Sequence, residues 1–206
     1  MRFSIILPCT LIPYKNCAKN LPEKLHRAIK SVIAQSFEDW ELIVVSDGCD
    51  KTMELVTPYV YDNLPKIRLI KIPKQKIWSG SVRNAGIFKA EGEIITYLDA
   101  DDKFGINHLQ IINDNFGDAD WVFHNDLIWN GKEFVENHCN MQVKGQCGTS
   151  NISFKRSLGV YWNDDTYLHD WHFIKQLQAL SNNYKIIPYA EYKICHRPGM
   201  PKKFDV

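Results

Sequence analysis

Three carboxylates within four positions give the chain its clearest chemical potential: Asp99, Asp101 and Asp102, with Ala100 between them. Like charges this close raise one another's pKa unless a positive charge lies among them. Mg²⁺ and Mn²⁺ prefer oxygen ligands, and they commonly bind one or two carboxylates together with the phosphates of a substrate. The cluster therefore predicts a site for a divalent metal. The alternative, a solvated turn in which Asp102 caps the next helix, accounts for Asp102 alone.

Two other polar segments are placed in the same way along the chain. Residues 8–10 (Pro-Cys-Thr) follow an apolar run at 3–7, and residues 46–48 (Ser-Asp-Gly) follow a second run at 41–45. The acidic cluster itself follows the run 94–98. Ligands of open parallel sheets bind beyond the carboxyl ends of the strands. Three polar clusters at one sheet edge therefore predict a single binding site.

The elements that must position these residues alternate along the first half. Continuous apolar runs at 3–7, 41–45, 67–72 and 94–98 are typical of parallel strands buried on both faces. Helical patterns at 21–33, 52–60 and 81–90 separate the runs, and Asn20 is the predicted N-cap of the first helix. In the second half we expect the following elements: helices at 107–116 and 167–180, strands at 121–123, 132–136, 185–187 and 192–195, and a polar loop at 137–150. The order predicts an α/β fold with a Rossmann-like, mostly parallel sheet flanked by helices.

Composition limits the class of protein. The chain has 206 residues, 45% hydrophobic, with 25 Lys and Arg against 24 Asp and Glu, which is typical of one globular domain. No long basic run is present, so we expect no nucleic-acid partner. No apolar stretch reaches the ~18 residues of a membrane span. Six cysteines without a CxxC pair favour reduced thiols in a cytoplasmic protein, and homo-oligomerisation stays open.

Two nucleotide-binding motifs are absent. The sequence contains neither GxxxxGK[ST] nor GxGxxG, which argues against a P-loop kinase or ATPase and against an NAD enzyme.

Five blocks together resemble the family 2 glycosyltransferases of GT-A fold. They are residues 4–8 (Ser-Ile-Ile-Leu-Pro), 28–37 (Ala-Ile-Lys-Ser-Val-Ile-Ala-Gln-Ser-Phe), 40–48 (Trp-Glu-Leu-Ile-Val-Val-Ser-Asp-Gly), 83–86 with 90–93 (Arg-Asn-Ala-Gly and Ala-Glu-Gly-Glu), and 97–102 (Tyr-Leu-Asp-Ala-Asp-Asp). The resemblance is close over the first half and weak over the second. It implies a single GT-A domain over 1–206, in which 1–102 bind a nucleotide sugar and 103–206 form a smaller α+β portion on the acceptor side.

The resemblance also implies a donor site. The nucleotide sugar would lie against Pro8, Asp47, Arg83, Asp99 and Ala100. Asp47 would accept a hydrogen bond from the base imide, and Asp99 would face the ribose or the metal's surroundings. Arg83 would hold the donor or support the acidic loop by bidentate pairing, the alternative being an ion pair on a helix surface. Asp101 would bind Mn²⁺ or Mg²⁺.

The second half carries fewer implied roles. Family members have a Glu-Asp pair at the start of a late helix that supplies the catalytic base, and here His169 stands in place of Glu, which leaves Asp170 as the base. Residues 146–150 resemble a glycine-containing loop beside the acceptor. His196 lies where a C-terminal histidine binds metal or pyrophosphate. Residues 14–16 (Tyr-Lys-Asn) come later than in the family pattern, which implies an inserted loop at the base pocket.

These expectations converge on one activity. The chain is expected to be an inverting, metal-dependent glycosyltransferase that moves a hexose-type sugar from a nucleoside diphosphate, of which UDP is favoured, to a hydroxyl of a glycan or other acceptor. Two alternatives stay open: a non-catalytic module that binds a nucleotide sugar or glycan, favoured by His169, and a sugar-phosphate nucleotidyltransferase. The latter class carries a Gly-rich loop after the first strand, whereas residues 8–16 contain no glycine. Trp78, Trp129, Trp162 and Trp171 are candidates for stacking on sugars, although aromatic residues more often belong to the core.

Overall fold

The structure is a computed structural model and describes residues 2–75, 79–163, 168–196 and 206. The strands are β1 (Phe3–Cys9), β2 (Trp40–Asp47), β3 (Ile67–Ile72), β4 (Ile94–Tyr97), β5 (Lys103–Phe104), β6 (Trp121–His124), β7 (Asp126–Trp129), β8 (Phe134–Asn137), β9 (Ile152–Lys155), β10 (Tyr184–Ile187) and β11 (Tyr192–Ile194). The helices are α1 (Leu21–Ile33), α2 (Asp50–Asp62), α3 (Gly80–Lys89), α4 (His108–Phe116) and α5 (His169–Leu180), with short 3-10 turns at Thr149–Asn151 and Arg156–Leu158.

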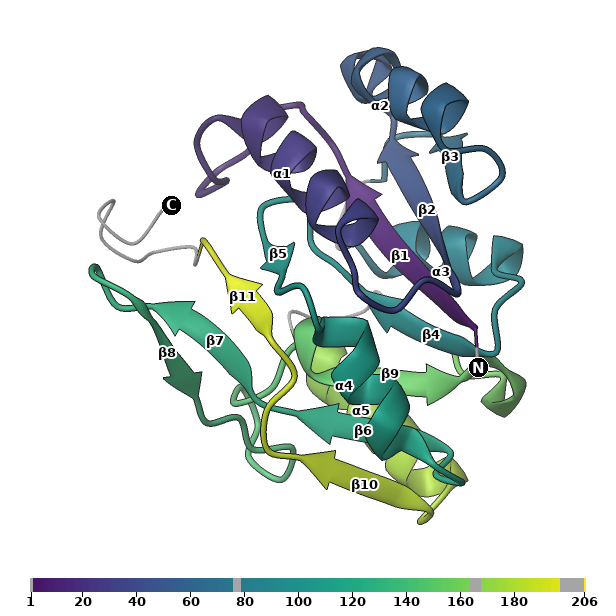
Figure 1. Cartoon of the computed structure of the whole chain (residues 1–206), viewed down its shortest axis with the longest axis vertical. Helices are drawn as coiled ribbons and strands as arrows, with labels where there is room; N and C mark the ends of the chain where they lie inside the picture. Colours follow the sequence, from purple (N-terminus) through teal and green to yellow (C-terminus); the bar gives the residue numbers. More distant parts are fainter. Residues whose placement is uncertain (1, 76–78, 164–167, 197–205) are drawn as a thin grey trace.

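A seven-stranded sheet forms the centre of the molecule (Figure 1). Its strand order is β10-β6-β9-β4-β1-β2-β3. Strands β3, β2, β1 and β4 are mutually parallel, and β10 is parallel to β6. Among the described strands of this sheet, only β9 runs antiparallel to its neighbours. The predicted mostly parallel sheet flanked by helices is therefore confirmed.

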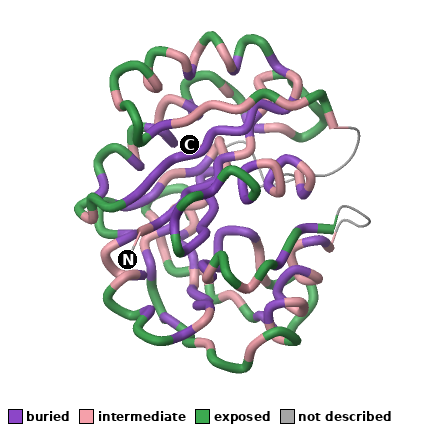
Figure 2. Tube along the Cα trace, turned by 90° about the vertical axis from the view of Figure 1, so that its right-hand side faces the viewer, coloured by how far each residue is buried: buried purple, intermediate pink, exposed green. Residues whose placement is uncertain are grey.

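The two faces of this sheet carry separate cores. Phe3, Ile5 and Leu7 of β1 point to a cluster completed by α1, α2 and α4, whereas Ile6 points to a cluster completed by α3 and α5. This alternation along a fully buried strand explains why the sequence shows a continuous apolar run. Figure 2 shows the resulting band of buried residues through the central strands.

Several predicted boundaries need correction. Strand β1 does not end before Pro8 but continues to Cys9, with Pro8 opposite Val45 of β2. The missing N–H of Pro8 is tolerated because β4 pairs with β1 only as far as Ile6. Asn20 stands at the N-cap position of α1, but its backbone is left-handed and its side chain makes no capping hydrogen bond. Strands β5, β7 and β9 were not predicted.

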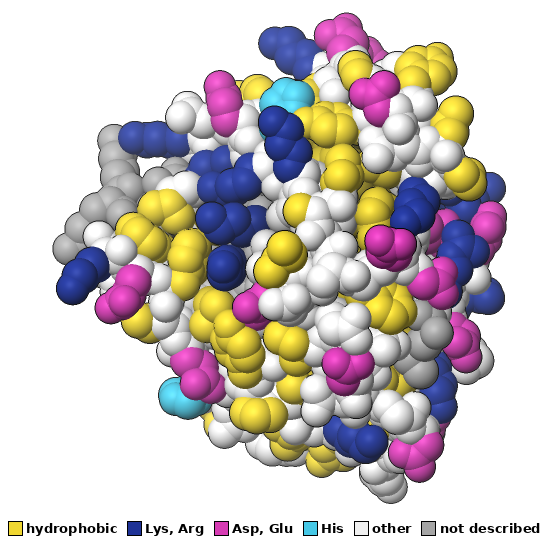
Figure 3. Space-filling model, in the orientation of Figure 1, with side chains coloured by type: hydrophobic (Ala, Val, Ile, Leu, Met, Phe, Trp, Pro, Cys, Tyr) yellow, Lys and Arg dark blue, Asp and Glu magenta, His cyan; other side chains and the backbone are white. Residues whose placement is uncertain are grey.

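A second, four-stranded sheet has the order β5-β11-β7-β8 and lies beside the large sheet (Figure 1). Strand β5 begins directly after the acidic cluster, and β11 ends directly before Cys195 and His196. Figure 3 shows Lys and Arg side chains gathered over α1, β5 and β11, beside hydrophobic side chains over the β7–β8 hairpin. None of the described helices is long and apolar enough to cross a membrane.

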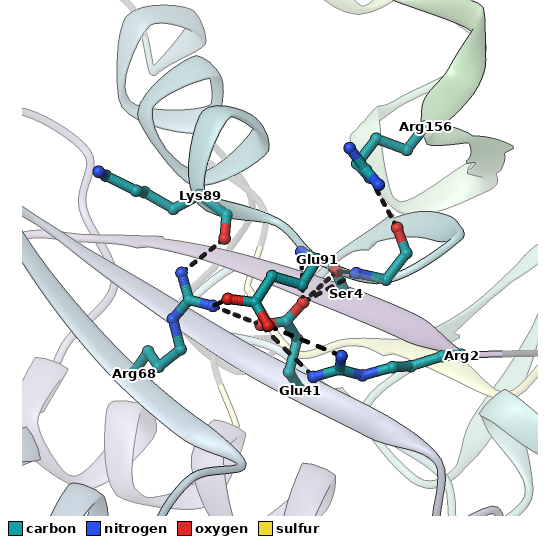
Figure 4. A network of polar contacts seen from close by, with 8 residues as sticks. Arg2, Ser4, Glu41, Arg68, Lys89, Glu91 and Arg156 are labelled. Carbon is teal, nitrogen blue, oxygen red and sulfur yellow. Dashed lines mark hydrogen bonds and ion pairs between the residues drawn. The ribbon is translucent and has the colours of Figure 1, made fainter.

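The buried carboxylate of Glu41 explains one of the sequence blocks, Ala-Glu-Gly-Glu at 90–93 (Figure 4). Glu41 Oε1 accepts hydrogen bonds from Ser4 Oγ at 2.7 Å and from the backbone nitrogens of Glu91 and Gly92 at 2.7 and 3.0 Å. Its other oxygen pairs with Arg68 at 3.1 Å. A Cβ on Gly92 would lie 2.7 Å from the backbone nitrogen of Ser4. Only glycine therefore lets the chain cross β1 closely enough to enter β4 in register.

Candidate functional site

The acidic cluster lies in the turn after β4, and its three carboxylates have different partners. Asp102 is buried; its two oxygens accept hydrogen bonds from Tyr192 Oη at 3.1 Å and from the backbone nitrogen of Cys195 at 2.7 Å. Burial and the charges of Asp101 and Asp99 raise the pKa of Asp102 well above its ordinary value. Asp102 therefore neither caps a helix nor faces solvent, and instead ties the acidic turn to the end of β11.

Asp99 pairs with Arg83, which reaches it from α3. Arg83 Nη2 lies 3.0 Å from Asp99 Oδ1, and Nη1 donates to Ser79 Oγ. The pairing thus uses one nitrogen and is not the bidentate pair that was expected. The Arg83 side chain is 4% exposed and lies over the Trp162 ring, 4.9 Å from its centroid. The alternative interpretation, an ion pair on a helix surface, is wrong because this guanidinium is buried.

The Arg-Asn-Ala-Gly block holds α3 in the position that this contact needs. A Cβ on Gly86 would lie 2.5 Å from Ile6 Cγ2, so the glycine allows α3 to pack close against β1. Asn84 exchanges two hydrogen bonds with the backbone of Trp162, at 2.8 and 2.9 Å. This block therefore links the large sheet to the segment that precedes α5.

Asp170, the predicted base, lies in the first turn of α5, and its side chain is 27% exposed. Its Oδ1 accepts a hydrogen bond from Thr149 Oγ1 at 3.0 Å and lies 3.3 Å from His169 Nε2. Burial raises the pKa of Asp170, but His169, Arg83 and Thr149 together hold it below its ordinary value. Asp170 is therefore an ionised carboxylate near neutral pH, ready to accept a proton or a hydrogen bond.

The guanidinium of Arg83 is influenced by carboxylates from two parts of the site, the acidic turn and the start of α5. Burial opposes the charge of its guanidinium, but the carboxylates of Asp99 and Asp170 outweigh burial and raise its pKa. Asp99 and Asp170 are 71 positions apart in the chain, yet both act on this single cation. The acidic turn and the start of α5 consequently border one polar site.

Asp101 has surroundings that suit a hard cation. Burial and the neighbouring charge of Asp99 raise its pKa, whereas the positive charges of His196 and Lys24 lower it. Burial first, and then the charges of Asp101 and Asp99, raise the pKa of Tyr14. His196 Nε2 lies 3.1 Å from the backbone oxygen of Asn16. The late Tyr-Lys-Asn segment is therefore placed beside the acidic turn.

This donor set can supply few ligands by itself. No group of three or more His, Cys, Asp or Glu side chains is arranged to hold a metal in the described part of the chain. Asp102 is committed to Tyr192 and Cys195, and one oxygen of Asp99 pairs with Arg83, so the acidic turn itself offers Asp101 and the second oxygen of Asp99 as donors. Oxygen-rich, incomplete sets of this kind fit Mg²⁺ or Mn²⁺ bound together with substrate phosphates.

Asp47, which the sequence placed after the second strand, is the last residue of β2, and its carboxylate is already engaged. Oδ1 accepts a hydrogen bond from the backbone nitrogen of Gln75 at 2.7 Å, and Oδ2 pairs with Lys74. The chain therefore returns over the end of β2 after β3. A base that binds Asp47 has to share or replace these contacts.

The end of β1 lies between Asp47 and the acidic turn. Burial first, and then the charges of Cys49, Asp101 and Asp47, raise the pKa of Cys9 to about 12. Pro8, the preceding residue, and Ala100 are both half-buried in this region. The structure thus brings the predicted donor residues to one sheet edge, although Asp47 contacts its own loop rather than the acidic turn.

Three residues support the site through contacts that the sequence did not predict for them. Tyr192 accepts a hydrogen bond from the Asp99 backbone nitrogen at 3.0 Å and donates to Asp102. Thr149 contacts Asp170 from the predicted acceptor-side loop. Trp162 is 5% exposed and belongs to the core, with its Nε1 2.8 Å from Tyr97 Oη. No local sequence pattern predicts the contact between Trp162 and Arg83, because the two residues are distant in the chain and meet only in the folded structure.

Family membership follows from comparison with known proteins. The model of "Glycosyl transferase family 2" matches residues 9–120, more than half of the chain. The chain belongs to this family. An uncharacterized glycosyltransferase of Nostoc sp. is 36% identical over 113 residues, which cover 53% of this chain and 34% of the relative. A dolichyl-phosphate beta-glucosyltransferase of Trichomonas vaginalis is 34% identical over 96 residues, covering 44% and 28%.

Solved structures extend the likeness of fold to nearly the whole chain. TarS of S. aureus in complex with UDP-GlcNAc superposes with a TM-score of 0.74 at 18% identity, covering 98% of this chain and 60% of that one. The mannosyltransferase PcManGT of Pyrobaculum calidifontis in complex with GDP-Man and Mn²⁺ gives 0.69 at 15% identity, covering 96% and 58%. The fold is thus that of GT-A glycosyltransferases. The chain spans about a third of the length of the two curated relatives.

Proposed function

We propose that the chain transfers one sugar from a nucleoside diphosphate, preferably UDP, to a hydroxyl of a glycan or other acceptor, with inversion at the anomeric carbon. The observation that carries this proposal is the place of Arg83, which pairs with Asp99 and lies over Trp162, whose ring centroid is 5.7 Å from that of His169 at the start of α5. The charge of Asp170 also raises the pKa of Arg83. Arg83 thereby joins the acidic turn, where family 2 enzymes bind the donor, and the carboxylate of Asp170, which can take a proton, into one site. Residues 1–102 supply the donor side and 103–206 the acceptor side of a single domain.

Asp170 acts as the general base. The acceptor oxygen attacks the anomeric carbon, the bond from that carbon to the diphosphate breaks, and the acceptor proton passes to a carboxylate oxygen of Asp170. Thr149 and Arg83 orient the carboxylate and keep it ionised before the reaction. A single displacement with one base inverts the configuration. Arg83 also keeps a positive charge beside the acidic turn, where the leaving diphosphate gains negative charge.

A divalent cation fits beside Asp101, with Asp99 and His196 as the other candidate donors. When bound there, the cation neutralises negative charge on the diphosphate. The raised pKa of Asp101, caused by burial and Asp99, supports the assignment because a carboxylate in these surroundings gains from a nearby cation. That the neighbour PcManGT is in complex with Mn²⁺ supports it further.

The donor base is proposed to bind between Pro8 and Asp47, with Ala100 and Asp99 beside the ribose and Arg83 beside the diphosphate. Complexes of the neighbour TarS with UDP and with UDP-GlcNAc support a uridine nucleotide. The six free thiols favour a reducing compartment, and we place the reaction in the cytoplasm.

The test is transfer from a panel of UDP-sugars and GDP-mannose to free sugars and oligosaccharides, with Mn²⁺, with Mg²⁺ and with EDTA. We expect release of the nucleoside diphosphate only with a cation, and NMR of the product should show an anomeric configuration opposite to that of the donor. A product with retained configuration would contradict the single displacement.

The same panel tests the non-catalytic alternative, which His169 in place of the usual Glu favours. In that case the donor raises the melting temperature of the protein, yet no nucleoside diphosphate is released with any acceptor or by hydrolysis. Formation of pyrophosphate from UTP and a sugar phosphate would instead indicate a nucleotidyltransferase.

A further inference from the structure

The outer face of the four-stranded sheet places two lysines side by side. Lys103 of β5 is the register partner of Lys193 of β11. Both ammonium groups lie over the Phe134 ring of β8, 5.1 and 5.7 Å from its centroid. Phe134 is itself opposite Trp129 of β7, with ring centroids 5.2 Å apart. Two cations and two aromatic rings therefore share one face of this sheet.

Helix α1 adds two more cations to this face. Helix α1 packs against β5, where Ser31 Oγ accepts a hydrogen bond from the backbone nitrogen of Phe104 at 3.1 Å. Arg27 of α1 donates to the backbone oxygen of Asp101, two positions before Lys103, and Lys24 lies one helical turn before Arg27. Figure 3 shows Lys and Arg side chains gathered over the same elements, α1, β5 and β11. We call Lys24, Arg27, Lys103 and Lys193 with Trp129 and Phe134 the basic–aromatic face.

The described carboxylate side chains form their ion pairs away from Lys103 and Lys193. Within the described residues, no carboxylate side chain forms an ion pair with Lys103 or Lys193. Glu136 shares the face through its register partner Leu127, but its carboxylate contacts Asn125 and His138. Lys24 and Arg27 donate to the Val206 oxygen. The chain as a whole carries only +1, so this clustering does not follow from an overall excess of cations.

The basic–aromatic face is continuous with the candidate active site. Arg27 donates a hydrogen bond to the backbone oxygen of Asp101. Lys103 follows Asp101 by two positions, and Lys193 precedes His196 by three. A ligand that lies across this face can therefore extend one end toward the acidic turn. Half-buried aromatic rings offer flat apolar surfaces to sugar rings, while nearby ammonium groups pair with acidic substituents.

We propose that the basic–aromatic face binds an acceptor glycan that carries negative charge as carboxylate, sulfate or phosphate. This inference rests on the proposed glycosyl transfer, since it names the class of acceptor for the same site. Lys103 and Lys193 pair with the acidic substituents, and Phe134 and Trp129 pack against the sugar rings. Because the two ammonium groups lie side by side, they favour an acidic acceptor over a neutral one of equal length.

The test compares the wild-type chain with the double variant Lys103→Gln, Lys193→Gln. Lys66→Gln is the matched control, because Lys66 also lies over an aromatic ring, 4.8 Å from the centroid of Trp40, but at the start of β2. The probes are hexagalacturonate, a heparin hexasaccharide and neutral maltohexaose, together with vesicles of phosphatidylcholine with and without phosphatidylserine. Calorimetric titration measures the affinity for each oligosaccharide, and sedimentation measures the affinity for vesicles.

We expect at least one acidic oligosaccharide to bind the wild type, and maltohexaose to bind much more weakly. The double variant should lose about tenfold or more in this affinity, whereas the control should stay within about twofold. Equal binding of the double variant, or equal binding of maltohexaose, overturns the proposal. Lysine-dependent binding to phosphatidylserine vesicles without binding of either acidic oligosaccharide overturns it in favour of a lipid surface.

A separate readout distinguishes this failure from failure of the proposed function. UDP with Mn²⁺ is titrated into the same three proteins. The expected result is unchanged UDP affinity in the double variant and in the control, because Lys103, Lys193 and Lys66 are not among the proposed donor residues. A wild type that binds no nucleotide contradicts the proposed function, whatever the oligosaccharides do.

Discussion

Acid should destabilise the fold through a buried histidine, His124 of β6. Its side chain is completely buried; Nδ1 lies 3.1 Å from the Asn125 carbonyl oxygen, and Nε2 has no hydrogen-bond partner among the described residues. Burial lowers the pKa of His124 from 6.5 to about 4. His108, whose ring lies 5.5 Å away, shifts in the same direction because of burial and the charge of His124. The His108 ring lies 6.0 Å from the ring of Tyr192, which holds the acidic turn.

The sign and size of the effect follow from proton linkage. Between pH 6.5 and about 4 the unfolded chain binds a proton at His124 and the folded chain does not, so the free energy of unfolding falls as the pH falls through this window. From pH 7 to pH 5 the loss from His124 alone is about 2 kcal/mol. His108 adds to this loss in the wild type.

Urea unfolding at pH 7 and at pH 5 measures this loss directly. The variant His124→Phe should lose about 2 kcal/mol less than the wild type between the two pH values, since the carboxylates that titrate in this range are common to both proteins. His138→Gln, which removes an exposed histidine, is the control and should lose as much as the wild type. An equal loss in His124→Phe and wild type would refute the reasoning.

Three further outcomes are expected. Asp101→Asn should abolish the dependence of UDP affinity on Mn²⁺ while leaving the melting temperature nearly unchanged; calorimetry that finds the same Mn²⁺ dependence in the variant would remove Asp101 from the metal site. Asp47→Ala should weaken UDP binding by about 1 to 3 kcal/mol, because a partnered polar group is lost. The control Asp50→Ala, at an exposed carboxylate that pairs with Lys71, should leave UDP affinity unchanged. Equal UDP affinity in Asp47→Ala and the wild type would place the base elsewhere. Gly92→Ala should lower the free energy of unfolding by about 1 to 3 kcal/mol, because its Cβ would lie 2.7 Å from the Ser4 backbone nitrogen. The control Gly148→Ala, whose Cβ would lie 3.4 Å from Ser150 Oγ, should cost much less. A cost at Gly92 no larger than at Gly148 would show that β1 can shift to accommodate the methyl group.

Local patterns in the sequence were sufficient for the parallel part of the sheet. A strand such as β1, which is buried on both faces, is continuously apolar. Helices α1 and α3 have apolar residues at helical spacing, and these residues pack on the sheet. Strand β9 was not predicted because it alternates Ile152 and Phe154 with Ser153 and Lys155 over only four residues, too short to distinguish from a loop. Its place between β4 and β6 depends on pairing partners that are distant in the chain.

The candidate site was predictable where a motif carries the chemistry. Asp99, Asp101 and Arg83 belong to blocks whose order resembles the family, and the structure brings Asp99 and Arg83 into contact. The sequence could not show that Asp102 accepts a hydrogen bond from Tyr192, or that Asp47 is bound by Lys74 and Gln75. These contacts join chain segments that meet only in the folded structure. Trp78, one of the candidates for stacking on sugars, lies outside the described residues.

The central claim is that Asp170 is the base of a sugar transfer whose donor binds at the acidic turn. The variant Asp170→Asn keeps the side-chain volume and an oxygen that can accept the hydrogen bond of Thr149, but it cannot take the acceptor proton. Its transfer rate should fall by about 10²- to 10⁴-fold, while the dissociation constant for the donor stays within a factor of a few; the control Asp118→Asn, at an exposed carboxylate, should leave both unchanged. Near-normal turnover in Asp170→Asn would contradict the account, and loss of donor binding together with turnover would show that Asp170 supports the donor site rather than the proton transfer.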